Sequence, residues 1–311
     1  MWTGVDMNLC IIGQEKSESN IRLLEEAKKA FGSVFFVPIN SIGIGLTDKF
    51  SIHYRATDLF KFKAILPRVS TKYCSYAYQI LSLFPSDTFM PIKPISFLLA
   101  DERFFLLTVL RKRGIPTIDL HMSRSTKAVE KILDEADYPM IIRAPEKKTG
   151  VVVKNKVEAK GVIDALTHLQ KNILIEEVVK DMISLYVADP YVVAAIRKKT
   201  KEIDVVFGKG NIKKYKPDIE TEQLALDAAK SVDAQIARVD ISLSDPMKVV
   251  NIELNPPLMD ASKATDIDIP KKIIKAVYEN YQNHKKKPLL IKFFEDAHSV
   301  VKDVLGSKKL L

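Results

Sequence analysis

Cysteine is scarce in this chain, because only Cys10 and Cys74 occur among 311 residues. Two cysteines without paired spacing argue against a disulfide framework, a zinc site and an iron–sulfur cluster. The scarcity fits a reducing compartment, so we expect a cytoplasmic protein.

Long apolar runs are missing as well. No segment approaches the roughly 18 apolar residues of a membrane span, and the N-terminus lacks the basic-then-apolar pattern of a signal peptide. The five histidines are scattered, and no Ser-His-Asp order or Cys-His pair stands out, which argues against covalent nucleophilic catalysis. We therefore expect no membrane partner and no catalytic triad.

Acidic residues are outnumbered, with 39 Asp and Glu against 48 Lys and Arg and a net charge of +9. This surplus favours anionic partners such as nucleotides and acidic small molecules. The lysines are scattered and aromatic residues do not interleave with them, so nucleic acid is not an expected partner. A hydrophobic fraction of 47% and a charged fraction of 28% are those of a globular protein, and the length favours two or three domains.

Hydrophobic periodicity predicts strand, helix and strand at residues 8–13, 18–31 and 34–39, which is typical of an open α/β sheet. Three prolines within residues 85–94 mark a first domain boundary. One helix is predicted over residues 98–113, closed by Gly114, and an amphipathic helix is predicted at the C-terminus. We expect domains at residues 1–94, 95–180, 181–284 and 285–311.

Two apolar segments near residues 240 and 253 carry polar side chains. Asp240 lies in one, and Glu253 and Asn255 lie in the other, directly before Pro256. Alternate strand residues share a face, so Glu253 and Asn255 point the same way, and Asp240 could face the same point from a neighbouring strand. Such oxygens suit a hard cation such as Mg²⁺, which usually shares its ligands with phosphates. The alternative is a solvated sheet face.

These two segments and several others together resemble the ATP-grasp superfamily, and its RimK-like ligases in particular. The resemblance runs from about residue 50 to residue 280, and it depends on the order and spacing of segments at residues 51–55, 65–68, 102–117, 139–143, 175–179, 193–197 and 265–269. It implies an α/β protein, with an N-terminal open-sheet domain followed by a two-lobed α+β ATP-grasp module that clamps the nucleotide.

The resemblance also implies roles for individual residues. Arg103 and Arg143 stand where the family has two phosphate-binding lysines, and a guanidinium fork can bind phosphate oxygens. Gly150 belongs to the flap over the phosphates, and Arg197 is the candidate catalytic residue. The remaining roles are the adenine hinge at Glu176, Glu177, Val178 and Val179, the ribose acceptor Asp181, and the substrate-carboxylate ligands Arg55 and Arg68. For single residues the alternatives are surface arginines, a core valine, a turn aspartate and an ordinary hairpin turn.

The function implied by the resemblance is ATP-dependent carboxylate–amine ligation through an acyl phosphate. An amino acid such as glutamate would be added to an acidic cofactor, peptide or protein, with Mg²⁺ or Mn²⁺ as the metal and a homo-oligomer as one assembly to consider. The chain departs from the family pattern, because the flap has the single glycine Gly150, residues 181–183 lack a basic residue, and residues 204–210 replace an Arg-Ser-Asn stretch. These departures favour an alternative, a catalytically degenerate nucleotide-binding protein that acts as a sensor or subunit.

Overall fold

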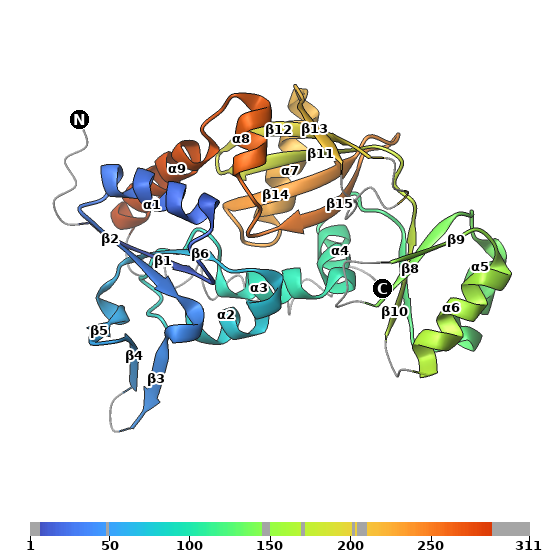
Figure 1. The fold of residues 1–311 in the computed structure, drawn as a ribbon, viewed down its shortest axis with the longest axis horizontal. Coiled ribbons are helices and arrows are strands. Elements are labelled where there is room, and N and C mark those ends of the chain that lie inside the picture. The colour runs from blue at the N-terminus through green and yellow to red at the C-terminus, as the bar shows by residue number, and fades with distance from the viewer. Residues whose placement is uncertain are drawn as a thin grey trace.

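The computed structural model describes residues 7–47, 50–144, 150–168, 172–200, 203 and 210–287. These residues form three lobes, each built on its own sheet (Figure 1). The N-terminal lobe, the central lobe and the C-terminal lobe follow one another along the chain, and α9 then returns to the first lobe.

The N-terminal lobe contains a parallel sheet in the order β2-β1-β6, with β1 at Asn8–Gly13, β2 at Ser33–Pro38 and β6 at Ala64–Arg68. Its central strand β1 is buried from Leu9 onward, as expected for a strand covered on both faces. The helix α1 (Glu18–Ala30) begins at Ser17, whose side chain accepts from the amide of Asn20. A small antiparallel sheet of β3 (Gly43–Leu46), β4 (Phe50–Tyr54) and β5 (Thr57–Asp58) projects from this lobe, away from the other two (Figure 1).

Helix α9 (Ile269–Lys286) completes the N-terminal lobe, although it comes from the end of the described chain. It lies against α1 (Figure 1), and Phe31 meets Tyr278 edge-on with ring centroids 5.5 Å apart. Arg22 of α1 also forms a 3.0 Å ion pair with Asp268, the N-cap of α9. Lys285 and Lys286, which the sequence assigns to a separate C-terminal segment, continue this helix, and the rest of that predicted segment lies outside the described residues from 288 on.

The central lobe is an antiparallel sheet in the order β7-β10-β8-β9. Its strands are β7 (Leu120–Ser123), β8 (Met140–Arg143), β9 (Val151–Val153) and β10 (Ile173–Glu177), and its helices are α5 (Thr126–Glu135) and α6 (Lys156–His168). Met140, Ile142, Ile173 and Ile175 join the core beneath the helices. Because strand side chains alternate, Arg143 and Glu176 lie on the opposite face of the sheet.

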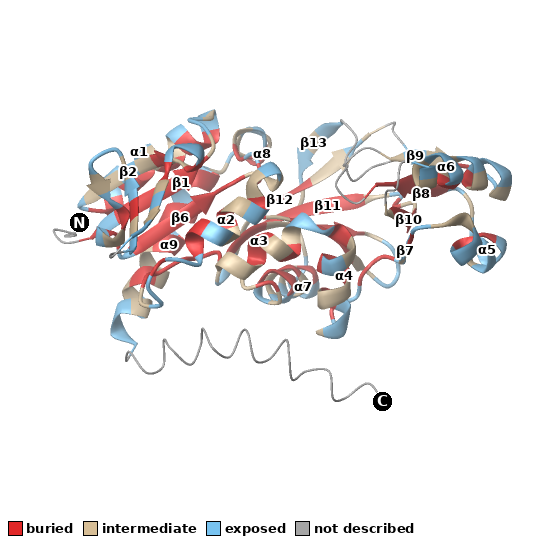
Figure 2. Cartoon of the chain, turned by 90° about the horizontal axis from the view of Figure 1, so that it is seen from below, coloured by how far each residue is buried: buried red, intermediate tan, exposed pale blue. Residues whose placement is uncertain are grey.

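The C-terminal lobe is a five-stranded antiparallel sheet in the order β13-β12-β11-β14-β15. Its strands are β11 (Met182–Ala188), β12 (Tyr191–Lys199), β13 (Asn211–Lys214), β14 (Ile236–Ser242) and β15 (Lys248–Glu253), with α7 (Ile219–Lys230) and α8 (Met259–Thr265) packed on it. Every residue of β11 is buried (Figure 2). One continuous hydrophobic core joins this lobe to the N-terminal lobe, whereas the central lobe has its own core.

The helix predicted over residues 98–113 is two helices in the structure. Helix α3 (Pro94–Asp101) ends at Glu102, whose φ of −111° and ψ of 99° are extended, and α4 (Arg103–Lys112) begins at the next residue. Gly114 follows α4 with a φ of 80°, as a glycine C-cap predicts. The break places Arg103 at the first turn of α4, where its side chain is buried.

Candidate active site

Strand β15 contacts several parts of the predicted site. Near its start, Lys248 pairs with Glu177 of the hinge, and the carbonyl of Val250 accepts a 2.9 Å hydrogen bond from Arg103. Asn251 donates to Asp240 at 3.2 Å, and Glu253 ends the strand opposite Arg238. Arg103, Glu177 and Asp240, predicted from distant segments, therefore each contact this strand.

Arg103 and Arg143, the predicted phosphate ligands, share one carboxylate. Arg103 donates from Nε and Nη2 to the two oxygens of Glu176, at 2.7 Å and 3.1 Å, and Nε of Arg143 lies 3.1 Å from Glu176 Oε1. All three side chains are buried. Two guanidinium groups against one carboxylate leave a net positive charge on this face of the central sheet, which suits a phosphate chain.

Gly150, the predicted flap glycine, lies against this cluster. A Cβ at this residue would lie 2.5 Å from Cγ2 of Ile141 and 3.3 Å from Cζ of Arg143. A larger residue would displace the side chain of Ile141 and press on the guanidinium of Arg143, so the glycine allows this close approach. The rest of the predicted flap, residues 145–149, and residues 204–209 of the replaced Arg-Ser-Asn stretch lie outside the described residues.

The predicted adenine hinge joins β10 to β11. Glu177 accepts hydrogen bonds from Nζ of Lys248 at 2.8 Å and 3.2 Å, and its amide donates to the carbonyl of Asp119. Val179 is buried and Val178 is half-buried, which provides an apolar wall. This stretch of extended backbone is of the kind that can offer amide and carbonyl groups to a purine edge.

Asp181 and Arg197, predicted as ribose acceptor and catalytic residue, are partners of each other. Nε of Arg197 donates to Asp181 Oδ1 at 3.0 Å, and a second ion-pair contact joins Nη2 to Oδ2. Both side chains are more than one-third exposed, so each can exchange this contact for a ligand.

Asp240 lies in β14 with no exposed surface and with both oxygens occupied. Arg238 donates to Oδ1 and Oδ2 at 2.9 Å each, Ser184 donates to Oδ1 at 2.6 Å, and Asn251 donates to Oδ2. Burial acts to raise the pKa of Asp240, but the charge and hydrogen bonds of Arg238, together with the hydrogen bonds of Ser184 and Asn251, outweigh it and hold that pKa below its usual value. Burial likewise acts to lower the pKa of Arg238, and Asp240 reverses the effect and raises it.

Neither Arg238 nor its neighbour Tyr186 on this face was among the site residues predicted from the sequence. The signal was present, because Arg238 and Asp240 are two residues apart in a strand and so share a face. Tyr186, on β11, lies opposite Arg238 and donates to the carbonyl of Pro257 at 3.2 Å. Burial raises the pKa of Tyr186 to about 12, so it remains a neutral hydroxyl donor at neutral pH.

Glu253 and Asn255 fit a hard cation better than Asp240 does. Both are partly exposed oxygen donors, although β15 ends at Glu253, so Asn255 lies in the bend after the strand rather than in its alternation. Within the described ranges no three His, Cys, Asp or Glu side chains are grouped to hold a metal ion. A cation here would therefore depend on an amide oxygen and on phosphates of a bound nucleotide.

Arg68 reaches this region from the N-terminal lobe. It ends β6 at the carboxyl edge of the parallel sheet, donates from Nε to Asn20 at 3.2 Å, and donates from Nη2 to the carbonyl of Pro256 at 2.8 Å. Its Nη1 is buried and has no hydrogen-bond partner among the described residues. Burial lowers the pKa of Arg68 to about 10, with the charge of Glu253 opposing the effect, so the group stays protonated at neutral pH.

Arg55, the second predicted substrate ligand, does not lie in the region around Arg68. It is exposed in the turn after β4, with a φ of 54°, and its guanidinium lies over the ring of Tyr54 at 5.3 Å. The small sheet that carries it projects away from the C-terminal lobe (Figure 1). The site built from the structure therefore contains Arg68 without Arg55.

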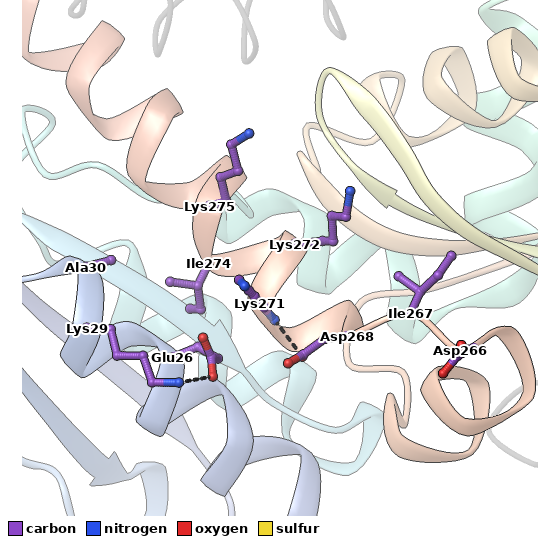
Figure 3. A pocket seen from close by; sticks show the side chains of 10 residues that line it. All are labelled: Glu26, Lys29, Ala30, Asp266, Ile267, Asp268, Lys271, Lys272, Ile274 and Lys275. Atoms are coloured by element: carbon purple, nitrogen blue, oxygen red, sulfur yellow. Dashed lines mark hydrogen bonds and ion pairs between the residues drawn. The ribbon is translucent and has the colours of Figure 1, made fainter. Parts of the chain in front are cut away.

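A hollow of about 570 Å³ lies between α1 and the start of α9 (Figure 3). Four lysines line it, together with an apolar floor and three acidic side chains: Lys29, Lys271, Lys272, Lys275, Ala30, Ile267, Ile274, Glu26, Asp266 and Asp268. None of these residues belongs to the predicted site, which lies at the junction of the lobes.

No helix within the described ranges has the length and apolar character to cross a membrane.

Three comparisons relate this chain to known proteins. Curated relatives include the "Probable alpha-L-glutamate ligase" of Thioalkalivibrio sulfidiphilus, 25% identical over 90% of this chain and 98% of the relative. The "Probable alpha-L-glutamate ligase 2" of Shewanella denitrificans is 27% identical over 88% and 96%. At these identities the relatives indicate shared descent over nearly the full chain.

Among solved structures, the ATP-grasp ligase PsnB complexed with a phosphomimetic variant of its minimal precursor, Mg and ADP matches with a TM-score of 0.71. It is 15% identical and covers 89% of this chain and 100% of that one. The D-alanine-D-alanine ligase of Coxiella burnetii matches with a TM-score of 0.60, 15% identity and coverage of 93% and 99%. These likenesses establish the ATP-grasp fold.

The model of the RimK-like ATP-grasp domain matches residues 100–277, which is more than half of the chain. That range contains β8, β10, the hinge and both strands of the predicted metal site. This chain therefore belongs to the RimK-like ATP-grasp family and is an ATP-dependent ligase that forms C–N bonds.

Proposed function

We propose that this ligase joins an amino acid such as glutamate to the carboxylate of an acidic small molecule, peptide or protein. One observation carries the proposal: Arg68 has a buried Nη1 that finds no hydrogen-bond partner among the described residues, beside Glu253 and Pro256 at the junction of two lobes. Because its Nε and Nη2 are already occupied, this Nη1 is the donor that a substrate carboxylate oxygen can accept from in a charge-assisted hydrogen bond. The names of the glutamate ligases among its relatives support the choice of amine.

The reaction has two steps in this proposal. An oxygen of the substrate carboxylate attacks the γ-phosphorus of ATP, which forms an acyl phosphate and releases ADP. The amine then attacks the acyl carbon, phosphate leaves, and the nitrogen gives up a proton. The bond formed is an amide, and the bonds broken are the β–γ phosphoanhydride of ATP and the acyl–phosphate bond.

In this proposal the side chains of the site have different roles. Arg103 of α4 and Arg143 of the central sheet bind the phosphates, with Glu176 holding both guanidinium groups in place. The backbone from Glu177 to Val179 binds the adenine. Asp181 releases Arg197 and accepts a hydrogen bond from a ribose hydroxyl. Arg197 then becomes free to approach the reacting groups.

Glu253 and Asn255 would hold Mg²⁺ together with the phosphates, where the metal would neutralise charge on the transferred phosphoryl group. The protein's own contribution is to place Arg68 and these two oxygen donors on opposite sides of the same junction. The carboxylate of the substrate is thereby oriented toward the nucleotide. Such orientation supplies much of the rate acceleration of a reaction between bound groups.

The proposal is tested by ADP release in a panel that combines amino acids with acidic acceptors. We expect one acid–amine pair to stimulate ADP release and to yield an amide detectable by mass spectrometry. In Arg68→Ala the KM for the acid should rise at least tenfold, while ATP affinity changes less than twofold, because Arg68 lies on the N-terminal lobe.

Arg55→Ala is the matched control, since it removes an exposed arginine of the same lobe that lies outside the site. Equal effects of both substitutions would contradict the role of Arg68. ATP binding without stimulated ADP release by any pair would favour the alternative of a nucleotide-binding protein.

A further inference from the structure

Arg238 and Asp240 form a closed pair on the face of the C-terminal sheet where the sequence predicts a metal. The guanidinium meets the carboxylate as a fork, with Nε 2.9 Å from Oδ1 and Nη2 2.9 Å from Oδ2. This bidentate geometry is among the strongest charge-assisted contacts between side chains.

The remaining hydrogen-bond acceptor sites of Asp240 are also occupied. Ser184 donates to Oδ1 and Asn251 donates to Oδ2, so the carboxylate accepts four hydrogen bonds, and its residue has no exposed surface. A carboxylate has about four lone-pair sites. Magnesium needs an oxygen at roughly 2.0–2.1 Å in near-octahedral geometry. Asp240 therefore has neither a free lone pair nor an open side for the metal.

Arg238 is also held by its neighbours on the sheet. Tyr186 lies opposite it on β11 and Glu253 lies opposite it on β15, and the side chain of Arg238 is 18% exposed. The guanidinium is thus a fixed positive charge between two carboxylates, with a small part of its surface open. A guanidinium in that setting can offer its outer N–H groups to a phosphate oxygen.

We infer that Arg238 takes the place of a metal ion beside Asp240. Asp240 is then a positioning residue for Arg238, and the nucleotide site binds a single divalent cation at Glu253 and Asn255. The inference depends on the proposed nucleotide site and changes its composition, because one of the charges on the phosphates is supplied by a side chain.

The test counts Mn²⁺ bound per chain in the presence of saturating AMP-PNP, by electron paramagnetic resonance of free Mn²⁺. Wild type should bind one Mn²⁺, and Asp240→Asn should still bind one, with affinity within about twofold. Arg238→Met should bind a second, because it leaves the Asp240 carboxylate without its cation. Glu253→Gln is the positive control, and its Mn²⁺ affinity should fall at least tenfold.

Two Mn²⁺ in wild type, or loss of Mn²⁺ in Asp240→Asn, would overturn the inference, and so would a count of one in a folded Arg238→Met. If Arg238→Met does not melt cooperatively, wild type and Asp240→Asn decide the question. A chain that binds no AMP-PNP, measured separately by calorimetry, overturns the proposed nucleotide site and the inference together.

Discussion

At the scale of single residues, the predicted site contains several buried charged side chains. Arg103 and Arg143 share Glu176, and Arg238 is paired with Asp240, so each of these guanidinium groups has a carboxylate partner. Arg68 differs, because its buried hydrogen bonds go to neutral oxygens of Asn20 and Pro256. A buried guanidinium without a bonded carboxylate is costly to keep, which makes Arg68 the residue with most to gain from an acidic ligand.

Arg143→Ala should weaken ATP binding by about 1.5–3 kcal/mol, the scale of a charge-assisted hydrogen bond. Adenosine lacks phosphates, so its affinity should change much less. Calorimetry with both ligands measures the difference. Arg124→Ala, an exposed arginine of the same lobe, is the matched control. Equal losses for ATP and adenosine would indicate that Arg143 acts through packing.

Cys10 should make the protein less stable at alkaline pH. Its thiol is buried in β1, and burial raises its pKa from 9.0 to about 12. Between these values the unfolded thiol loses its proton while the folded thiol keeps it, so ionisation favours the unfolded state. The free energy of unfolding should fall by up to about 1.4 kcal/mol per pH unit from this group.

The comparison that isolates this effect is Cys10→Ala. Its starting stability will be lower because the substitution leaves a cavity, but its stability should decline less steeply from pH 9 to pH 11 in urea titrations. Parallel declines in the two proteins would show that Cys10 does not titrate in this way.

At the scale of elements, β15 and α4 connect the lobes through polar contacts. Lys248 at the start of β15 holds the hinge, and Arg103 at the start of α4 reaches both Glu176 on β10 and Val250 on β15. The break between α3 and α4 at Glu102 is what places Arg103 there. A continuous helix would have carried the chain past this position.

Glu176→Ala should lower the free energy of unfolding by about 3–5 kcal/mol, because two buried guanidinium groups lose their shared carboxylate. Urea unfolding followed by circular dichroism measures the loss. Glu177→Ala removes the neighbouring, partly exposed carboxylate and should cost about 0–1 kcal/mol. A small loss in Glu176→Ala would mean that the cluster is hydrated and mobile in solution.

At the scale of the whole molecule, two lobes share one core and the central lobe has its own. Polar contacts, among them those of Arg103 and of the hinge, join the central lobe to the others. The net charge of +9 favours the approach of anionic ligands to the protein.

Binding of the acidic substrate should accordingly weaken with salt. Exposed charges are screened over roughly 8–10 Å at physiological ionic strength, so the KM for the acid should rise severalfold between 50 and 500 mM salt. Adenosine binding across the same series is the control, since it carries no charge. A KM that is independent of salt would show that long-range attraction does not guide the substrate.

The sequence by itself determined the order of the elements and the kind of chemistry. Local periodicity and backbone preference can be read directly from the sequence. They predict the β-α-β opening, the two strands around Asp240 and Glu253, and Gly114 after a helix. The pairing of Arg238 with Asp240 was not predicted, although residues two apart in a strand share a face.

Only the tertiary structure decided which distant side chains meet. Arg68 and Pro256 are 188 positions apart, and Arg103 and Glu176 are 73 apart, so no periodicity links them. The same holds for Arg55, whose segment resembles a site motif although it projects away from the cleft. Charges are brought together by the packing of whole lobes, and the free energy of that packing comes from apolar cores that contain none of them.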